Sequence, residues 1–98
     1  MPFSLHLTDA AKSALGELRR DRGLTKRLKA VQRALARLEA DPRHPGLRSH
    51  PFRSLAGPGG EIVFEIYAEQ DTPAAYRIFW YYGPEKGQIT VIGITPHP

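Results

Sequence analysis

The last quarter of the chain constrains the fold more than any other stretch. It contains two runs rich in aromatic and β-branched residues, at 76–82 and 89–94, which are separated by a segment with Gly83, Pro84 and Gly87. Such runs on either side of turn-forming residues are typical of a β-hairpin. The rest of the chain must therefore bury an apolar hairpin.

Arg77 is the exception within this hairpin, because it is a charged residue in the most apolar run of the sequence. A charged side chain in such a strand needs either a partner or a face that is open to solvent. Two interpretations follow. Arg77 binds an anion on an open face, or it forms a cross-strand ion pair with Glu65, which lies on the preceding predicted strand.

The length of 98 residues suits one two-layer core, so we expect a single domain over residues 1–98. Hydrophobic residues make up 41% of the chain and charged residues 24%, which is typical of a soluble globular protein. Residues 1–20 lack the basic start and the apolar stretch of a signal peptide. The sequence therefore predicts a cytoplasmic protein with no membrane association.

The residues that could hold a metal or act as a nucleophile are few. The chain has no cysteine, which excludes disulfides, thiolate metal ligands and a thiol nucleophile. His6, His44, His50 and His97 do not share the spacing of a metal site. We therefore predict no metal and no cofactor, and any catalysis would be acid–base and electrostatic.

Charge is distributed unevenly along the chain. Residues 19–53 contain eleven of the fourteen Lys and Arg residues but only three of the ten acids. A basic segment of this kind is typical of a protein that binds a polyanion, because Lys and Arg contacts to phosphates release counterions. The alternative is that these residues form the solvated face of helices, which are often rich in arginine.

The period of the apolar residues changes along the chain. Residues 3–8 alternate between apolar and polar, which predicts a strand, whereas 9–22 and 25–41 show the spacing of three and four residues that predicts amphipathic helices. Alternation returns at 61–69, and 53–56 could form a short edge strand.

This order predicts an α+β arrangement, in which an N-terminal strand precedes a helical hairpin. The hairpin would pack on one face of a four- or five-stranded, mostly antiparallel sheet.

Alternation also predicts which side chains face the helices. The apolar set expected to face them is Ile62, Phe64, Ile66, Ile78, Trp80, Ile92 and Ile94. The set expected on the opposite face is Glu65, Tyr67, Arg77, Phe79, Tyr81, Gly93, Thr95 and His97. An uncovered face with this composition is suited to stacking bases and binding a phosphate.

Three short segments together resemble the RelE/ParE toxin superfamily. They are DPRHPGL at 41–47, LAG at 55–57 and YRIFW at 76–80. With the order of strand, two helices and three strands, the resemblance covers almost the whole chain. It implies the toxin of a type II toxin–antitoxin system, neutralised by a cognate antitoxin protein. Members of the RelE branch are ribosome-dependent mRNA endonucleases, and the ParE branch inhibits gyrase.

The resemblance also implies roles for individual residues. Arg77 matches the arginine that supports the scissile phosphate, and His97 lies near the basic position at the end of the last strand. These two are the predicted catalytic residues. Two departures are visible: Tyr67 stands where the family commonly has arginine, and 63–67 holds no counterpart of the RelE-branch lysines.

Further residues are candidates for binding RNA. Arg48 and Arg53 would hold backbone phosphates, and Tyr67 or Tyr81 would stack a base. The alternative function is a non-catalytic binding protein of the same fold, or a ParE-like gyrase inhibitor. The missing lysines favour this alternative, as does Glu65, which is available to neutralise Arg77.

Overall fold

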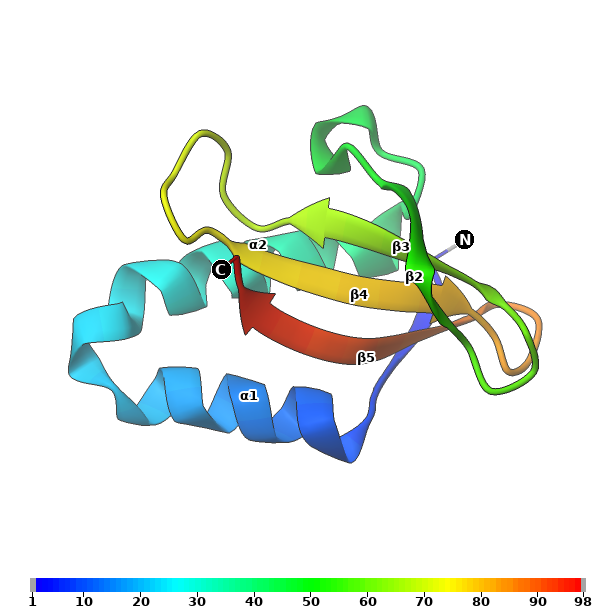
Figure 1. The fold of residues 1–98 in the computed structure, drawn as a ribbon, viewed down its shortest axis with the longest axis horizontal. Helices are drawn as coiled ribbons and strands as arrows, with labels where there is room; N and C mark the ends of the chain where they lie inside the picture. The colour runs from blue at the N-terminus through cyan, green and yellow to red at the C-terminus, as the bar shows by residue number, and fades with distance from the viewer. Residues whose placement is uncertain (1, 98) are drawn as a thin grey trace.

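The computed structural model describes residues 2–97, which form two helices and a five-stranded sheet (Figure 1). The elements are β1 (Ser4–Leu7), α1 (Asp9–Arg20), α2 (Thr25–Ala40), β2 (His50–Ala56), β3 (Ile62–Tyr67), β4 (Tyr76–Tyr82) and β5 (Gln88–Pro96). Their order in the sheet is β1-β5-β4-β3-β2, with β1 parallel to β5 and the other pairs antiparallel. The predicted α+β architecture is confirmed.

Local sequence signals explain the helical hairpin. The side-chain oxygen of Thr8 accepts a hydrogen bond from the amide of Ala11 at the start of α1, and Asp9 follows at the positive end of the helix dipole. Only the 3-10 turn Arg22–Leu24 joins the two helices, so they run antiparallel. Helix α2 ends two residues before Pro42, as expected for a residue that cannot continue a helix.

The helices bury their apolar stripes against one face of the sheet, with α1 running alongside β5 and α2 behind the strands (Figure 1). The fully buried side chains of this layer are Leu18, Val31, Leu38, Ile66, Ile78, Trp80, Ile89 and Val91. Truncating such a leucine to alanine typically costs about 2–5 kcal/mol. Among the helices of residues 2–97, none is long and apolar enough to cross a membrane.

A bulge in the hairpin corrects the predicted faces of β5. Phe79 pairs with Gly93, but the next residue, Trp80, pairs with Val91, so Ile92 is skipped. Because the extra residue reverses the alternation, Val91 faces the helices and Ile92 packs on the opposite face. The prediction that Ile92 faces the helices is therefore wrong.

The helices do not cover Ile62, contrary to the prediction. Its side chain was expected to face the helices, but the residue is 61% exposed. It begins β3 at the margin of the core, where its neighbour on the same face, Phe64, is itself only partly buried.

The opposite face of the sheet is only partly open, which corrects the expectation of an uncovered surface. Phe52 on β2 packs against Phe79 with a distance of 4.8 Å between the ring centroids, and β2 crosses in front of β4 in Figure 1. Glu65, Phe79 and Tyr81 are consequently buried, with exposures of 4%, 5% and 6%. The face remains accessible where Tyr67, Arg77 and Thr95 lie side by side, at the end of β3.

Candidate functional site

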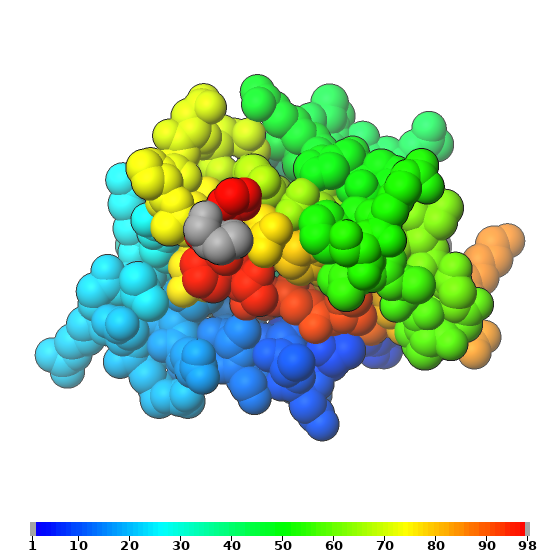
Figure 2. Space-filling model, in the orientation of Figure 1, coloured from blue at the N-terminus to red at the C-terminus, as the bar shows by residue number. Residues whose placement is uncertain are grey.

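Polar side chains gather on this face where β3 and β5 end and β4 begins. The strand register places Tyr67 beside Arg77 and Arg77 beside Thr95, while His50 lies opposite Glu65 in the next row. Figure 2 views this side of the molecule: the yellow loop of residues 69–75, the red C-terminal end and the green β2 segment surround a shallow hollow. Residues from four strands therefore contribute to one site.

Glu65 lies at the centre of an ion-pair cluster that it forms with His50 and Arg77. Its Oε2 lies 3.0 Å from Nη1 of Arg77, and its Oε1 lies 2.6 Å from Nε2 of His50. The carboxylate is nearly inaccessible to water, since its side chain is 6% exposed, whereas that of His50 is 52% exposed. A buried carboxylate is tolerable here because Arg77, together with His50 when it is protonated, balances its charge.

The surroundings of His50 favour its imidazolium form. Its Nδ1 lies 3.0 Å from the carbonyl oxygen of Arg48, and its Nε2 faces Glu65, so both ring nitrogens meet groups that only accept hydrogen bonds. The bond to the Arg48 carbonyl, with the hydrogen bond and charge of Glu65, raises the pKa of His50 above its ordinary value of 6.5, although partial burial opposes this. When the ring is protonated, both nitrogens donate.

Arg77 is paired and largely enclosed, as the second interpretation of the sequence proposed. Its side chain is 17% exposed, and the guanidinium carbon lies 4.9 Å from the ring centroid of Phe79. Its Nε is buried and has no hydrogen-bond partner among residues 2–97. A ligand could therefore reach Arg77 only through the exposed part of its side chain.

A groove runs past this cluster. One part, of about 250 Å³, is lined by Arg48, His50, Tyr67 and Gln70. A larger part, of about 700 Å³, shares three of these residues and extends along the loop of residues 69–75 to His97. One side of the groove is thus basic, at Arg48. The other side is the loop of residues 69–75, which carries carboxylate, amide and hydroxyl groups.

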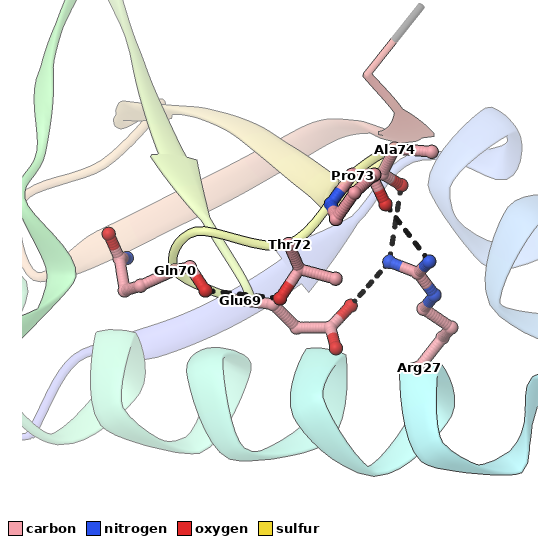
Figure 3. A network of polar contacts seen from close by, with 6 residues as sticks. All are labelled: Arg27, Glu69, Gln70, Thr72, Pro73 and Ala74. Atoms are coloured by element: carbon pink, nitrogen blue, oxygen red, sulfur yellow. Dashed lines mark hydrogen bonds and ion pairs between the residues drawn. The ribbon is translucent and has the colours of Figure 1, made fainter.

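The loop of residues 69–75 is fixed by Arg27 of α2 (Figure 3). Nη1 of Arg27 donates to Oε1 of Glu69 at 2.8 Å and to the carbonyl of Ala74 at 3.3 Å, and Nη2 donates to the carbonyl of Pro73 at 3.0 Å. Asp71 and Ala74 have positive φ angles of 54° and 56°, which non-glycine residues adopt only when surrounding contacts hold them. A single helix residue therefore shapes one wall of the groove.

The structure brings most of the predicted site residues together. Arg48, Tyr67 and His97 line the same groove, and the rings of Tyr67 and His97 meet edge to face at 5.9 Å. Arg77 adjoins Tyr67 in the sheet.

Two predicted residues are not part of this assembly. Tyr81 is 6% exposed, so the expectation that it lies on an open face is wrong. Arg53 is exposed on β2, but Phe52, immediately before it, points into the sheet. Because successive side chains of a strand point to opposite sides, Arg53 points away from the groove.

His50 is the residue that the sequence analysis missed as a member of the site. We considered it only as a metal ligand, because the edge strand was expected to begin at 53 whereas β2 begins at His50. A strand starting three residues earlier would have placed His50 beside Glu65. Among residues 2–97 there is no group of three or more His, Cys, Asp or Glu side chains that could hold a metal ion.

Comparisons with known proteins match the fold. No protein-family model matches the sequence, and no curated protein matches it significantly. The YoeB/ParE toxin from Agrobacterium tumefaciens has a TM-score of 0.69 over 97% of this chain and 99% of that chain, at 12% identity. A chain of the archaeal RelE–RelB complex from Pyrococcus horikoshii OT3 has a TM-score of 0.66 over 98% and 96%, at 14% identity.

The YoeB dimer from Staphylococcus aureus gives a TM-score of 0.63 over 100% of both chains, at 10% identity. These likenesses extend over nearly the full length of each protein. The chain therefore has a RelE-like toxin fold, as the sequence motifs predicted.

Proposed function

We propose that this protein is the toxin of a type II toxin–antitoxin system and that it cleaves mRNA at the ribosome as a metal-independent endoribonuclease. The observation that carries the proposal is the groove in which Arg48, Tyr67 and His97 lie close to Arg77. The fold supports it, because the solved structures that share this fold are described as YoeB/ParE and RelE toxins.

The reaction needs no metal, because the nucleophile is the ribose 2′-hydroxyl of the RNA itself. Its oxygen attacks the adjacent phosphorus, the bond to the 5′-oxygen of the next nucleotide breaks, and a 2′,3′-cyclic phosphate forms. A base accepts the proton of the 2′-hydroxyl, and an acid protonates the leaving oxygen. In our proposal His97 is one of these groups, and Arg77 stabilises the negative charge that develops on the phosphate.

The remaining candidates bind the RNA. Arg48 holds a backbone phosphate at the basic side of the groove, and Tyr67 stacks a base. The side chain of Arg53 points away from the groove, so any phosphate that it contacts lies outside the groove. Tyr81 has too little exposed surface to stack a base, so Tyr67 takes this role alone.

We also propose that the protein binds a cognate antitoxin and the ribosome. One of the solved structures with this fold is a RelE–RelB complex. An acidic antitoxin segment would suit the basic residues between 19 and 53.

The test of the proposed activity is cleavage of mRNA by purified protein with ribosomes, read by primer extension. Wild-type protein should cut, and a message with a 2′-deoxyribose at the cut position should resist. Arg77→Ala and His97→Ala should each lower the rate by about 100-fold or more, as expected for losing a charge-stabilising or proton-transfer group. His6→Ala, an exposed histidine on β1 at the far edge of the sheet, is the matched control. Intact messages with wild-type protein would refute the proposal.

The alternative function is inhibition of gyrase without cleavage of RNA. It is favoured by the ion pair with Glu65, which neutralises Arg77. A supercoiling assay with purified gyrase separates the two, since only the alternative predicts loss of supercoiling together with intact messages.

A further inference from the structure

The ion-pair cluster of His50, Glu65 and Arg77 has two charge states. With His50 protonated, two cations face one carboxylate and the cluster carries a net positive charge. With His50 neutral, Glu65 and Arg77 cancel each other. Because Glu65 is buried and 3.0 Å from Arg77, a phosphate that contacts this guanidinium also meets the field of the carboxylate.

The geometry gives His50 control over this field. Its Nε2 lies 2.6 Å from Glu65, and its Nδ1 lies 3.0 Å from the Arg48 carbonyl. A neutral imidazole has one donor nitrogen and one acceptor nitrogen, so it can satisfy only one of these two oxygens. Loss of the proton therefore breaks one of the two bonds and removes the positive charge beside Glu65, which leaves Arg77 to balance the charge of this carboxylate.

The guanidinium offers a phosphate the same end that contacts Glu65. Nε is buried, and Nη1 donates to Glu65. The strong contact of an arginine with a phosphate uses two neighbouring N–H groups. With Nε enclosed, this pair is formed by Nη1 and Nη2, so the phosphate lies beside the carboxylate of Glu65 and is repelled by it unless another cation balances that charge.

We propose that His50 is a positioning residue for Arg77: when protonated it holds Glu65 and leaves Arg77 to bind a phosphate group, and when neutral it returns Arg77 to Glu65. The inference rests on the proposed function for the identity of the anion, a phosphodiester of RNA. The inference concerns the binding of RNA by Arg77 and does not depend on the cleavage step. His50 acts through Glu65 and does not touch the reacting atoms.

Other polar groups surround the cluster. Tyr67 on β3 contacts the His50 ring edge to face at 6.4 Å, and Arg48 lines the same groove. His97, at the end of β5, lies on the other side of Tyr67 and is a second histidine beside the groove. The test must therefore separate His50 from His97.

The test measures binding of a fluorescent 2′-O-methyl RNA oligonucleotide by anisotropy between about pH 5.5 and 9. This probe cannot be cleaved, because its 2′-oxygen carries no proton. The wild-type Kd should rise by up to about tenfold per pH unit above the pKa of His50, since one proton is linked to binding. His50→Gln should bind weakly at all pH values and lose this slope. His50→Gln/Glu65→Gln should regain tight binding that does not vary in this way, because no carboxylate competes for Arg77.

Two controls complete the experiment. His97→Gln should retain the slope, and His6→Gln, on the far edge strand, should match wild type. Thermal melts confirm that each variant is folded.

Three results would overturn the inference: a wild-type slope in His50→Gln, no recovery in the double variant, or no binding by wild type near pH 6. If the Kd shows the expected dependence on pH but mRNA stays intact in the cleavage assay with ribosomes, the proposed function fails and the inference holds. If mRNA is cut but the slope is absent, the inference fails alone.

Discussion

At the scale of single residues, His50 links the pH of the solution to the stability of the fold. Its pKa in the folded state lies above 6.5, chiefly through the bond to the Arg48 carbonyl and then through Glu65. Because the folded state binds the proton more tightly than the unfolded state does, the contribution of His50 to stability is complete below about pH 6.5. It is lost as the pH rises through the raised folded pKa.

Urea unfolding of wild type and His50→Gln across this range checks the link. The difference between their unfolding free energies should be largest below about pH 6.5 and should shrink at higher pH. Titration of the His50 ring by NMR should place its pKa above 6.5, the ordinary value for histidine. A difference that is constant with pH would show that the imidazolium is not the stabilising form.

Arg77→Ala should destabilise the fold by an amount that depends on pH. Below the pKa of His50, Glu65 keeps one cation, so the loss should be small. Above it, neither cation faces the buried carboxylate, and the loss should grow by about 1–3 kcal/mol, the usual range for a buried polar group that loses a partner. Adding Glu65→Gln should recover most of the loss at high pH, and Lys86→Ala in the exposed β4–β5 turn is the control. Equal losses at both pH values would count against the shared carboxylate.

The sequence analysis singled out Arg77 and predicted either an open face or a pair with Glu65 for it. The structure combines the two environments. The pair with Glu65 is formed, and the side chain still keeps 17% of its surface exposed beside the groove. His50 could not be placed in the same way. Its role depends on a register between β2 and β3 that no local pattern specifies, since Pro51 beside it is typical of a loop or an edge strand.

At the scale of secondary structure elements, prediction succeeded where the period of the apolar residues is uniform. Both helices, β1, β3 and β4 lie where alternation or helical spacing places them. It failed in β5, because one bulge at Ile92 reverses the faces of the residues before it. The covering of the second face by β2 was also missed, because a twisted edge strand folds over the sheet and packs Phe52 against Phe79 and its neighbours.

The loop of residues 69–75 depends on a contact between elements that sequence alone does not reveal. Arg27→Ala removes three hydrogen bonds that join α2 to this loop. The partners are partly exposed, so the loss of stability should be only about 1 kcal/mol. The loop should nevertheless loosen, because Asp71 and Ala74 keep their positive φ angles only while it is held.

Hydrogen exchange measures this effect directly. Amides of residues 69–75 should exchange faster in Arg27→Ala, while those of α1 and β5 should keep their protection. Binding of the 2′-O-methyl oligonucleotide should weaken, since the loop forms a wall of the groove. Lys29→Ala, which removes an exposed charge from the same helix, should change neither. Unchanged exchange in the loop would show that Arg27 is not its anchor.

At the scale of the whole molecule, the arginines of the helices form two groups, one away from the groove and one beside it. The exposed arginines of α1, Arg19 and Arg20, lie on the helical side, away from the groove. Arg33 and Arg37 of α2 also belong to the helices, but together with Tyr67 and Gln70 they line a small pocket of about 130 Å³. Because Tyr67 and Gln70 also line the groove, these two arginines extend its basic side around the edge of the sheet.

This arrangement predicts that the two groups differ in their contribution to RNA binding. Each phosphate contact on single-stranded nucleic acid contributes about 0.7 to the slope of log K against log salt concentration. Arg33→Ala/Arg37→Ala should therefore lower this slope by about 1.4, and it should weaken binding at low salt. Arg19→Ala/Arg20→Ala removes the same charge from the helical side, and its slope should stay close to that of wild type.

The comparison of these two double variants decides between the two interpretations of the basic segment. A bulk effect of net charge acts on both variants alike, because the long-range field depends little on where two charges are removed. A path for the RNA backbone acts only through the residues along it. Slopes that fall equally in the two variants would mean that the arginines of α2 form a solvated helix face, and that bound RNA does not continue beyond the groove.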